Sequence, residues 1–251
     1  MIRLIRAELL KLRTTQVWFW LLLATVAVSV LLVVAQIAPS DGVRDASQVP
    51  DLFSSAANGY VVVFVLGVLG ITTEFRYQTI TPTVLITPSR WAVVTAKMIT
   101  YALVGIVYAL AATLAELVVA VPWLAAEDVD VDFGNGDVQH AVVGVFAVLA
   151  LFGIVGLGIG ALLRNQIVAV VVGIVYLIVL QPIISAVPGL KQIFPYTPGG
   201  AVISILHTGG GDATIGNLTL LPTAGGVVAL LLWAFVPAVL GAQFTLTRDI
   251  T

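Results

Sequence analysis

Cysteine is absent from this 251-residue sequence, and histidine occurs only twice. Without cysteine the chain has no disulfide, no thiolate nucleophile and no thiolate metal ligand. His140 and His207 lie in different polar segments, and neither belongs to a cluster with metal-ligand spacing. The sequence also lacks a G-x-x-x-x-G-K-[ST] phosphate loop, a serine-nucleophile motif and a basic patch interleaved with aromatic residues. These absences predict a chain with no catalytic centre, no metal or cofactor of its own, and no nucleic-acid partner.

Charge is also scarce, since 10% of the residues are charged and 60% are hydrophobic. The mean hydropathy is +1.11. A soluble domain carries roughly 25% charged residues, so this chain has too few charges to cover a surface that faces water. We therefore predict an all-α membrane protein with a single transmembrane domain over residues 1–251.

Long apolar runs alternate with polar segments along the chain. A helix needs about 20 apolar residues to cross a hydrocarbon core of ~30 Å. The six predicted spans are residues 17–35, 52–73, 98–121, 141–163, 167–187 and 222–244.

Residues 1–16 precede the first span and have an amphipathic pattern. Ile2, Ile5, Leu9 and Leu12 recur at helical spacing, with arginines clustered to one side of this apolar stripe. The pattern predicts a helix that lies in the membrane interface, in contact with lipid. The alternative is a simple positive flank that orients the first span, and the two interpretations are compatible.

Cations are divided unequally between the two sides that six spans define. Only Arg44 and Lys191 fall on the side away from the termini. Nine fall on the side of the termini: Arg3, Arg6, Lys11, Arg13, Arg76, Arg90, Lys97, Arg164 and Arg248. Because cytoplasmic segments carry the excess of Lys and Arg, we predict a cell-membrane protein with both termini in the cytoplasm.

The polar segment at residues 74–97 reads EFRYQTITPTVLITPSRWAVVTAK and separates the second span from the third. Its Glu-x-Arg-x-x-Thr pattern, proline-rich bend, arginine and final lysine resemble the first cytoplasmic loop of ABC-2-type transporter permeases. Residues 8–14, ELLKLRT, are similar to the N-terminal part of that family. The resemblance covers the whole chain in architecture and a small part of it in motif.

This resemblance implies the membrane subunit of a bacterial ABC exporter with a type V, ABCG-like fold. The loop would hold a coupling helix that docks on a separately encoded ATPase, with these contact residues: Glu74, Arg76, Thr79 and Arg90. Two ATPase subunits would bind ATP and magnesium, and the permease would form a homodimer or a heterodimer with a relative. The alternative is an ordinary charged loop that ends two spans.

Short re-entrant helices before the sixth span are also implied, within residues 188–221. The apolar stretch at 201–206 is too short to cross the membrane. Non-helical backbone at membrane depth must be buried in protein or line a cavity. We therefore predict that this region packs on the fifth and sixth spans as an external gate, whereas the alternative is an exposed loop.

In the resembled family the second and fifth spans border the substrate path. Ser54 and Asn58 are four residues apart in the second span, and Gln181 and Ser185 have the same spacing in the fifth. Residues at this spacing share a helix face. These four residues are candidates for a path that exports a drug, antibiotic, peptide or lipid. Ordinary hydrogen bonding between helices is the alternative.

Three further features lie in or beside the spans. Gly156 and Gly160 form a GxxxG match, which favours close helix packing within one subunit, with a dimer contact as the alternative. Glu116 is the only acid inside a span, and we expect its side chain to extend to the external surface. Lys97 is expected to anchor the third span by extending to the membrane surface.

The alternative function is a channel, or an integral-membrane enzyme or scaffold without an ATPase partner. An enzyme should place paired acids or a base near one membrane face, but the acids at 127–137 have no partner base in the sequence. A channel should show a polar stripe through several spans, and the sequence has none.

Overall fold

A computed structural model describes residues 1–39, 42–77, 90–207, 214–215 and 218–247. These residues are almost entirely helical, and the strands among them are one antiparallel pair, β1 (Thr214–Ile215) with β2 (Leu218–Thr219). Six helical stretches are long and apolar enough to cross a membrane: Val17–Ile37, Ala46–Arg76, Trp91–Ala126, Gly136–Leu163, Gln166–Ala186 and Thr223–Gly241. The prediction of an all-α protein with six membrane-spanning helices is confirmed.

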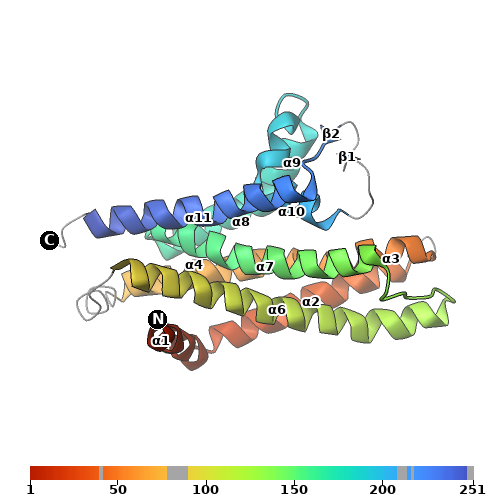
Figure 1. The fold of residues 1–251 in the computed structure, drawn as a ribbon, viewed down its shortest axis with the longest axis horizontal. Helices are drawn as coiled ribbons and strands as arrows, with labels where there is room; N and C mark the ends of the chain where they lie inside the picture. Colours follow the sequence, from red (N-terminus) through yellow and green to blue (C-terminus); the bar gives the residue numbers. More distant parts are fainter. Residues whose placement is uncertain (40–41, 78–89, 208–213, 216–217, 248–251) are drawn as a thin grey trace.

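The first half of the chain forms one short helix and three spans (Figure 1). Its elements are α1 (Ile2–Thr14), α2 (Val17–Ile37), η1 (Ala46–Gln48), α3 (Val49–Ser54), η2 (Ser55–Gly59), α4 (Tyr60–Arg76) and α6 (Arg90–Ala126). The elements from η1 to α4 together make the second span. Residues 78–89, where the sequence predicts a coupling helix, lie outside the described residues.

The second half contains three spans and a set of short elements before the last of them. Its elements are α7 (Gly136–Leu163), α8 (Gln166–Ile174), η3 (Val175–Leu180), α9 (Gln181–Ala186), η4 (Lys191–Tyr196), α10 (Pro198–Leu206) and α11 (Thr223–Thr247). The turn between α7 and α8 is short because Arg164 adopts a left-handed conformation (φ 51°) and Asn165 caps α8.

Helix α7 is the centre of the bundle and packs against α4, α6 and α11 (Figure 1). Its glycines make these approaches possible, since a side chain at Gly156 would overlap the carbonyl oxygen of Phe64 in α4. A Cβ at Gly160 would lie 2.7 Å from Cγ2 of Ile71, which is also in α4. The GxxxG match therefore packs helices within one subunit, as the sequence predicts.

Two spans depart from regular α-helix close to their polar residues. The second span passes through a 3₁₀ segment, η2, between α3 and α4. The fifth span widens into a π-helix, η3, in which the N–H of Gln181 bonds to the carbonyl of Tyr176. Pro182 has no N–H to donate into the preceding turn, which accounts for the local rearrangement.

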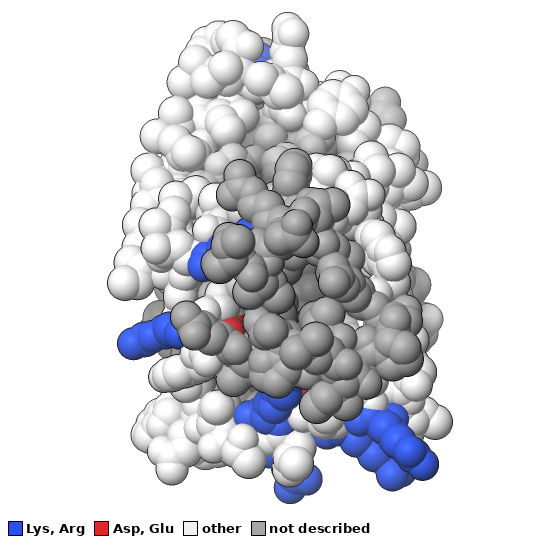
Figure 2. Space-filling view, turned by 90° about the vertical axis from the view of Figure 1, so that its left-hand side faces the viewer, with Lys and Arg blue, Asp and Glu red and all other residues white. Residues whose placement is uncertain are grey.

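The N-terminal helix α1 and the C-terminal end of α11 lie at the same end of the bundle (Figure 1), which we call the terminal end. Lys and Arg side chains gather at this end, and little acidic surface is visible there (Figure 2). The exposed cations on it include Arg3, Arg6, Arg13 and Arg76. Helix α1 has the predicted position in the chain, and its location in a membrane interface stays a prediction.

The segment before the sixth span contains the short helices η4 and α10. Helix α10 packs along α11 and also contacts α7, and Ala201, Val202 and Ile205 are buried there. Its nine residues extend about 14 Å at ~1.5 Å each, too little to cross a membrane. The short helices predicted before the last span are thus present, and their role as a gate stays a prediction.

Candidate functional site

Four charged side chains meet at the terminal end of the bundle, and we call them the charge cluster: Glu8, Lys11, Glu74 and Lys97. Lys97 Nζ lies 2.6 Å from Glu8 Oε2 and 2.8 Å from Glu74 Oε1. Lys11 Nζ lies 2.8 Å from Glu8 Oε1 and 2.7 Å from Glu74 Oε1. Two acids and two bases therefore neutralise each other through charge-assisted hydrogen bonds.

The charge cluster is almost sealed from solvent. Lys97 is 2% exposed, Glu74 is 5% exposed and Glu8 is 7% exposed. Only Lys11 is open to solvent on one side. A buried charge is costly unless it is paired, so removal of one member would leave its partner uncompensated. The prediction that Lys97 extends to the membrane surface is wrong, because Lys97 is enclosed by Glu8 and Glu74.

The α1 members of the charge cluster have shifted pKa values. Burial opposes ionisation of Glu8, but Lys97 and Lys11 outweigh burial and hold the pKa of Glu8 below its ordinary value. Burial similarly disfavours the charged form of Lys11, but its bonds to Glu74 and Glu8 raise the pKa of Lys11 above its ordinary value. Both groups are therefore ionised at neutral pH.

The charge cluster connects three helices at one point. Glu74 lies in the last turn of α4, Lys97 lies in α6, and Glu8 and Lys11 come from α1. Residues 78–89 join α4 to α6, so both helices that flank this segment are bound to α1. The same buried ion pairs therefore hold α1, α4 and α6 together next to this segment.

The residues predicted to contact an ATPase have different surroundings. Glu74 is inside the charge cluster, although its Oε2 has no hydrogen-bond partner among the described residues. Arg76 and Tyr77 are exposed just beyond it, with the guanidinium 5.7 Å from the ring centroid. Thr79 lies outside the described residues. Arg90 is the first residue of α6, and its side chain also lies outside the described part of the protein.

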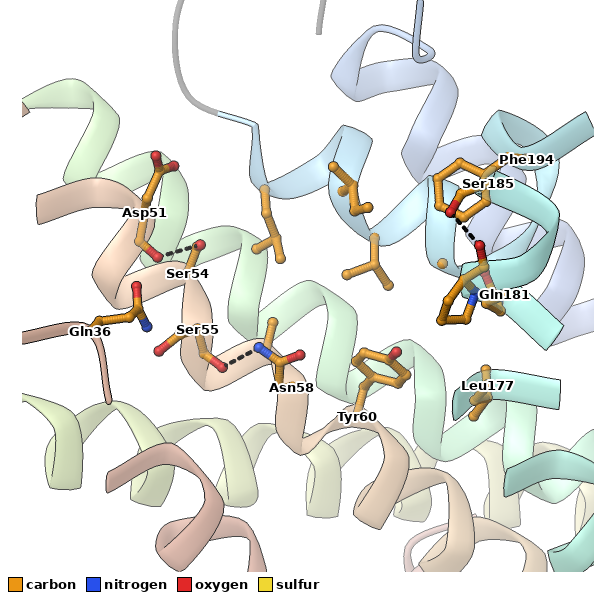
Figure 3. A pocket seen from close by; sticks show the side chains of 16 residues that line it. Gln36, Asp51, Ser54, Ser55, Asn58, Tyr60, Leu177, Gln181, Ser185 and Phe194 are labelled. Carbon is orange, nitrogen blue, oxygen red and sulfur yellow. Dashed lines mark hydrogen bonds between the residues drawn. The ribbon is translucent and has the colours of Figure 1, made fainter. Parts of the chain in front are cut away.

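A second site lies between the second and fifth spans, and we call it the polar cavity (Figure 3). Its volume is about 510 Å³, which falls in the range of ~300–1,000 Å³ typical of small-molecule sites. It is lined by Gln36, Asp51, Ser54, Ser55, Ala57, Asn58, Tyr60, Leu177, Gln181, Pro182, Ser185, Phe194, Gly199, Val202, Ile203 and Leu206. All four predicted substrate-path residues, Ser54, Asn58, Gln181 and Ser185, are among them.

The second-span wall of the polar cavity comes from α3, η2 and the start of α4. Ser54 Oγ donates to the carbonyl of Asp51 at 2.7 Å, and Asn58 Nδ2 donates to the carbonyl of Ser55 at 2.9 Å (Figure 3). These bonds satisfy backbone groups in the segment where the span changes from α-helix to 3₁₀-helix. The side-chain oxygens remain on the cavity side as acceptors.

The fifth-span wall is built around Gln181, which is 4% exposed. Its Oε1 accepts from Thr197 Oγ1 at 3.1 Å, whereas its Nε2 has no partner among the described residues. Gly199 leaves the space for this side chain, since a Cβ there would overlap Gln181 Oε1. The amide is therefore fixed by the segment before α10, and its N–H donors are enclosed in the protein.

Glu116 does not extend to a surface, and that prediction is wrong. The side chain is fully buried, and its Oε1 accepts from Ser55 Oγ at 2.9 Å. The 3₁₀ segment η2 places Ser55 against α6, so a partner in the protein is available where water was expected. Ser55 also lines the polar cavity, and one hydroxyl thus links the cavity wall to a buried carboxyl group.

Several residues of the two sites were missed by the sequence analysis. Glu8 and Lys11 share a face of α1 at i,i+3, but nothing local in the sequence indicates that Glu74 and Lys97 complete their pairing. Thr197 has a detectable signal, because a threonine before Pro198 fits a helix N-cap. Its bond to Gln181 depends on tertiary packing.

Six apolar helices of spanning length, with a buried charge cluster at one end and a polar cavity between two of them, define a multi-pass α-helical membrane protein. A family model described as "ABC-2 family transporter protein" matches residues 4–181. The chain belongs to the ABC-2 transporter family and is the permease of an ABC transporter. Family membership implies association with an ABC ATPase and a dimeric arrangement. A search of curated proteins finds no match.

Proposed function

We propose that this permease forms the translocation path of an ATP-driven exporter and is powered by a separate ATPase. The polar cavity carries this proposal, because it joins the polar faces of the second and fifth spans in a volume suited to a small molecule. The substrate would pass between this chain and a second copy, or a close relative, across the cavity. The exporter would work in the plasma membrane with both termini in the cytoplasm.

The fifth span supports the dimeric part of the proposal. Its large apolar side chains are exposed over much of its length, including Ile167, Val171, Val175 and Ile178. A helix that packs on its own chain along one face only needs lipid or another subunit on the other face. A partner permease on this side would complete the wall of the polar cavity.

The charge cluster supports coupling through the segment between α4 and α6. Two ATPase subunits would bind ATP and magnesium, and their closure would displace this segment. Glu74 and Lys97 attach the two flanking helices to α1. Within this proposal Glu74 fixes the base of the segment, while Arg76 is open to contact with the ATPase, together with Thr79 and Arg90.

The experiment compares Arg76→Ala with Arg3→Ala in the permease co-expressed with its ATPase. Both residues are exposed cations at the terminal end, but only Arg76 adjoins the segment between α4 and α6. Arg76→Ala should lower the amount of ATPase recovered with the permease, or its ATP hydrolysis in proteoliposomes, by several-fold. Arg3→Ala should leave both unchanged. Equal behaviour of the two variants would remove the coupling assignment.

A further inference from the structure

We propose that the polar cavity binds a small amphiphile with a positively charged head group, and that it disfavours anions. This inference rests on the proposed function and specifies the class of substrate. The reasons are the sign of the charge in the lining and the division of the cavity into a polar and an apolar part.

The charge of the lining has one sign. Asp51 is the only charged residue among the sixteen that line the cavity in the described part of the chain, and its side chain is exposed. Among the described residues, no Lys, Arg or His contributes to this lining. An anion in the cavity would lose hydration without gaining a cationic partner, whereas a cation would gain the carboxylate of Asp51.

On the second-span side of the cavity, side-chain hydroxyl and amide groups donate hydrogen bonds to other groups of the protein. The hydroxyls of Ser54 and Ser55 donate to the Asp51 carbonyl and to Glu116 Oε1, and Asn58 Nδ2 donates to the carbonyl of Ser55. Gln36 Nε2 likewise donates to the Leu32 carbonyl at 3.3 Å. The two serine hydroxyls are thereby left as acceptors, whereas the amide groups of Asn58 and Gln36 each keep a second N–H, so these groups can both accept from a ligand and donate to it.

On the fifth-span wall the serine hydroxyl likewise donates to the protein backbone, whereas the glutamine amide nitrogen has no acceptor among the described residues. Ser185 Oγ donates to the carbonyl of Pro182 at 2.8 Å, so its hydroxyl oxygen is left as an acceptor. Gln181 Nε2 is a buried donor without a partner among the described residues. On this wall a ligand donor therefore meets the hydroxyl oxygen of Ser185, while the Gln181 amide N–H groups are enclosed in the protein.

The remaining lining is apolar and comes mostly from one side. Val202, Ile203 and Leu206 of α10 line it together with Leu177 and Phe194. These side chains suit an apolar ligand body, and the rings of Tyr60 and Phe194 add faces that attract a cation. Asp51 and Ser185 lie on opposite sides of the cavity (Figure 3), so one molecule can contact both with its head near Asp51.

The test uses two fluorescent three-ring probes that are similar in shape and opposite in charge. 9-Aminoacridine is a cation with N–H donors, and anthracene-9-carboxylate is an anion without donors at neutral pH. Binding is measured by titration of the purified full-length permease in nanodiscs of zwitterionic lipid. We expect saturable binding of 9-aminoacridine and at least tenfold weaker binding of anthracene-9-carboxylate.

Two pairs of variants locate the binding. Asp51→Asn should weaken 9-aminoacridine binding by up to about 5-fold, as expected for one exposed ion pair. Asp130→Asn, an exposed acid outside the cavity, should have no effect. Ile203→Trp should fill the cavity and abolish binding, whereas Ile193→Trp, at an exposed residue outside the lining, should not.

The outcomes separate this inference from the proposed function. Equal affinity for the two probes, no saturable binding of 9-aminoacridine, or no difference between Ile203→Trp and Ile193→Trp would overturn the substrate class, even if the complex hydrolyses ATP and exports another compound. Selective binding that Ile203→Trp abolishes would support it, even if no ATPase associates with the chain.

Discussion

Lys97 in α6 donates to Glu8 in α1 across 89 residues of sequence, with Nζ 2.6 Å from Glu8 Oε2. The same ammonium group donates to Glu74 Oε1 at 2.8 Å. One buried lysine therefore connects the N-terminal helix to both helices that flank residues 78–89.

Replacement of Lys97 by Met should destabilise the protein by about 3–5 kcal/mol, because Glu8 and Glu74 would share a single, half-exposed lysine. The double variant Glu8→Gln/Lys97→Met should lose less stability than the sum of the two single variants. Thermal unfolding in detergent measures all three, with Arg3→Met as the control at an exposed cation. Strictly additive losses would show that Glu8 and Lys97 are not energetically coupled.

The pKa shifts set the pH range over which Glu8 and Lys11 stabilise the fold. The pKa of Glu8 is lowered from 4.5, so its contribution is complete above that value and is lost as the pH falls through the lower folded pKa. The pKa of Lys11 is raised from 10.5, so its contribution is complete below that value and is lost as the pH rises through the higher folded pKa.

The melting temperatures of the wild type and Glu8→Gln should therefore differ by a constant amount between about pH 5 and pH 9. The difference should shrink at more acidic pH, where Glu8 takes up a proton. For Lys11→Met the difference should shrink on the alkaline side, where Lys11 loses its proton, and also at acidic pH, where its partner Glu8 takes up a proton. A difference in melting temperature between the wild type and Glu8→Gln that widens as the pH falls would contradict the lowered pKa of Glu8.

A methyl group at Gly156 should force α7 away from α4, because the added Cβ would overlap the backbone carbonyl of Phe64. Overpacking of this kind costs about 1–3 kcal/mol or more when the backbone has to move. Gly136→Ala is the matched control, since nothing lies within 4 Å of its ideal Cβ position. Melting temperatures should fall for Gly156→Ala and not for Gly136→Ala, and equal values would argue against the tight crossing.

The division of cations predicts that the segment between α6 and α7 lies outside the cell. Asp132 is exposed in this segment, and the natural chain has no cysteine to interfere. Asp132→Cys should react with an impermeant maleimide added to intact cells, whereas Arg3→Cys at the terminal end should react only after permeabilisation. The reverse pattern would invert the topology.

The spans could be predicted because apolar runs of sufficient length have few other uses in a chain with so little charge. Their ends were less certain, as α6 shows by beginning at Arg90 instead of residue 98. Polar residues at Lys97 and before it suggested a loop, but Lys97 is neutralised by acids from two other helices. That compensation depends on tertiary packing and has no local signal.

In the candidate site, too, the local pattern could be predicted from the sequence, but the tertiary arrangement could not. The i,i+4 spacing of Ser54 with Asn58, and of Gln181 with Ser185, predicts that each pair shares a helix face, and all four residues line the polar cavity. Their convergence on one cavity depends on the 3₁₀ segment in the second span and the π-helix in the fifth, which hydrophobicity alone does not reveal. The burial of Glu116 was missed for the same reason, because Ser55 meets it only through η2.

The central claim is that this chain works with a separate ATPase, and purification from its native membrane tests it most directly. The sequence has no G-x-x-x-x-G-K-[ST] phosphate loop, and we assign ATP hydrolysis to a partner. The tagged permease in mild detergent should co-purify with a P-loop ATPase in equimolar amount and hydrolyse ATP in a vanadate-sensitive manner. Recovery of an intact, folded permease with neither the ATPase nor the activity, under conditions that preserve a known ABC complex, would contradict the account.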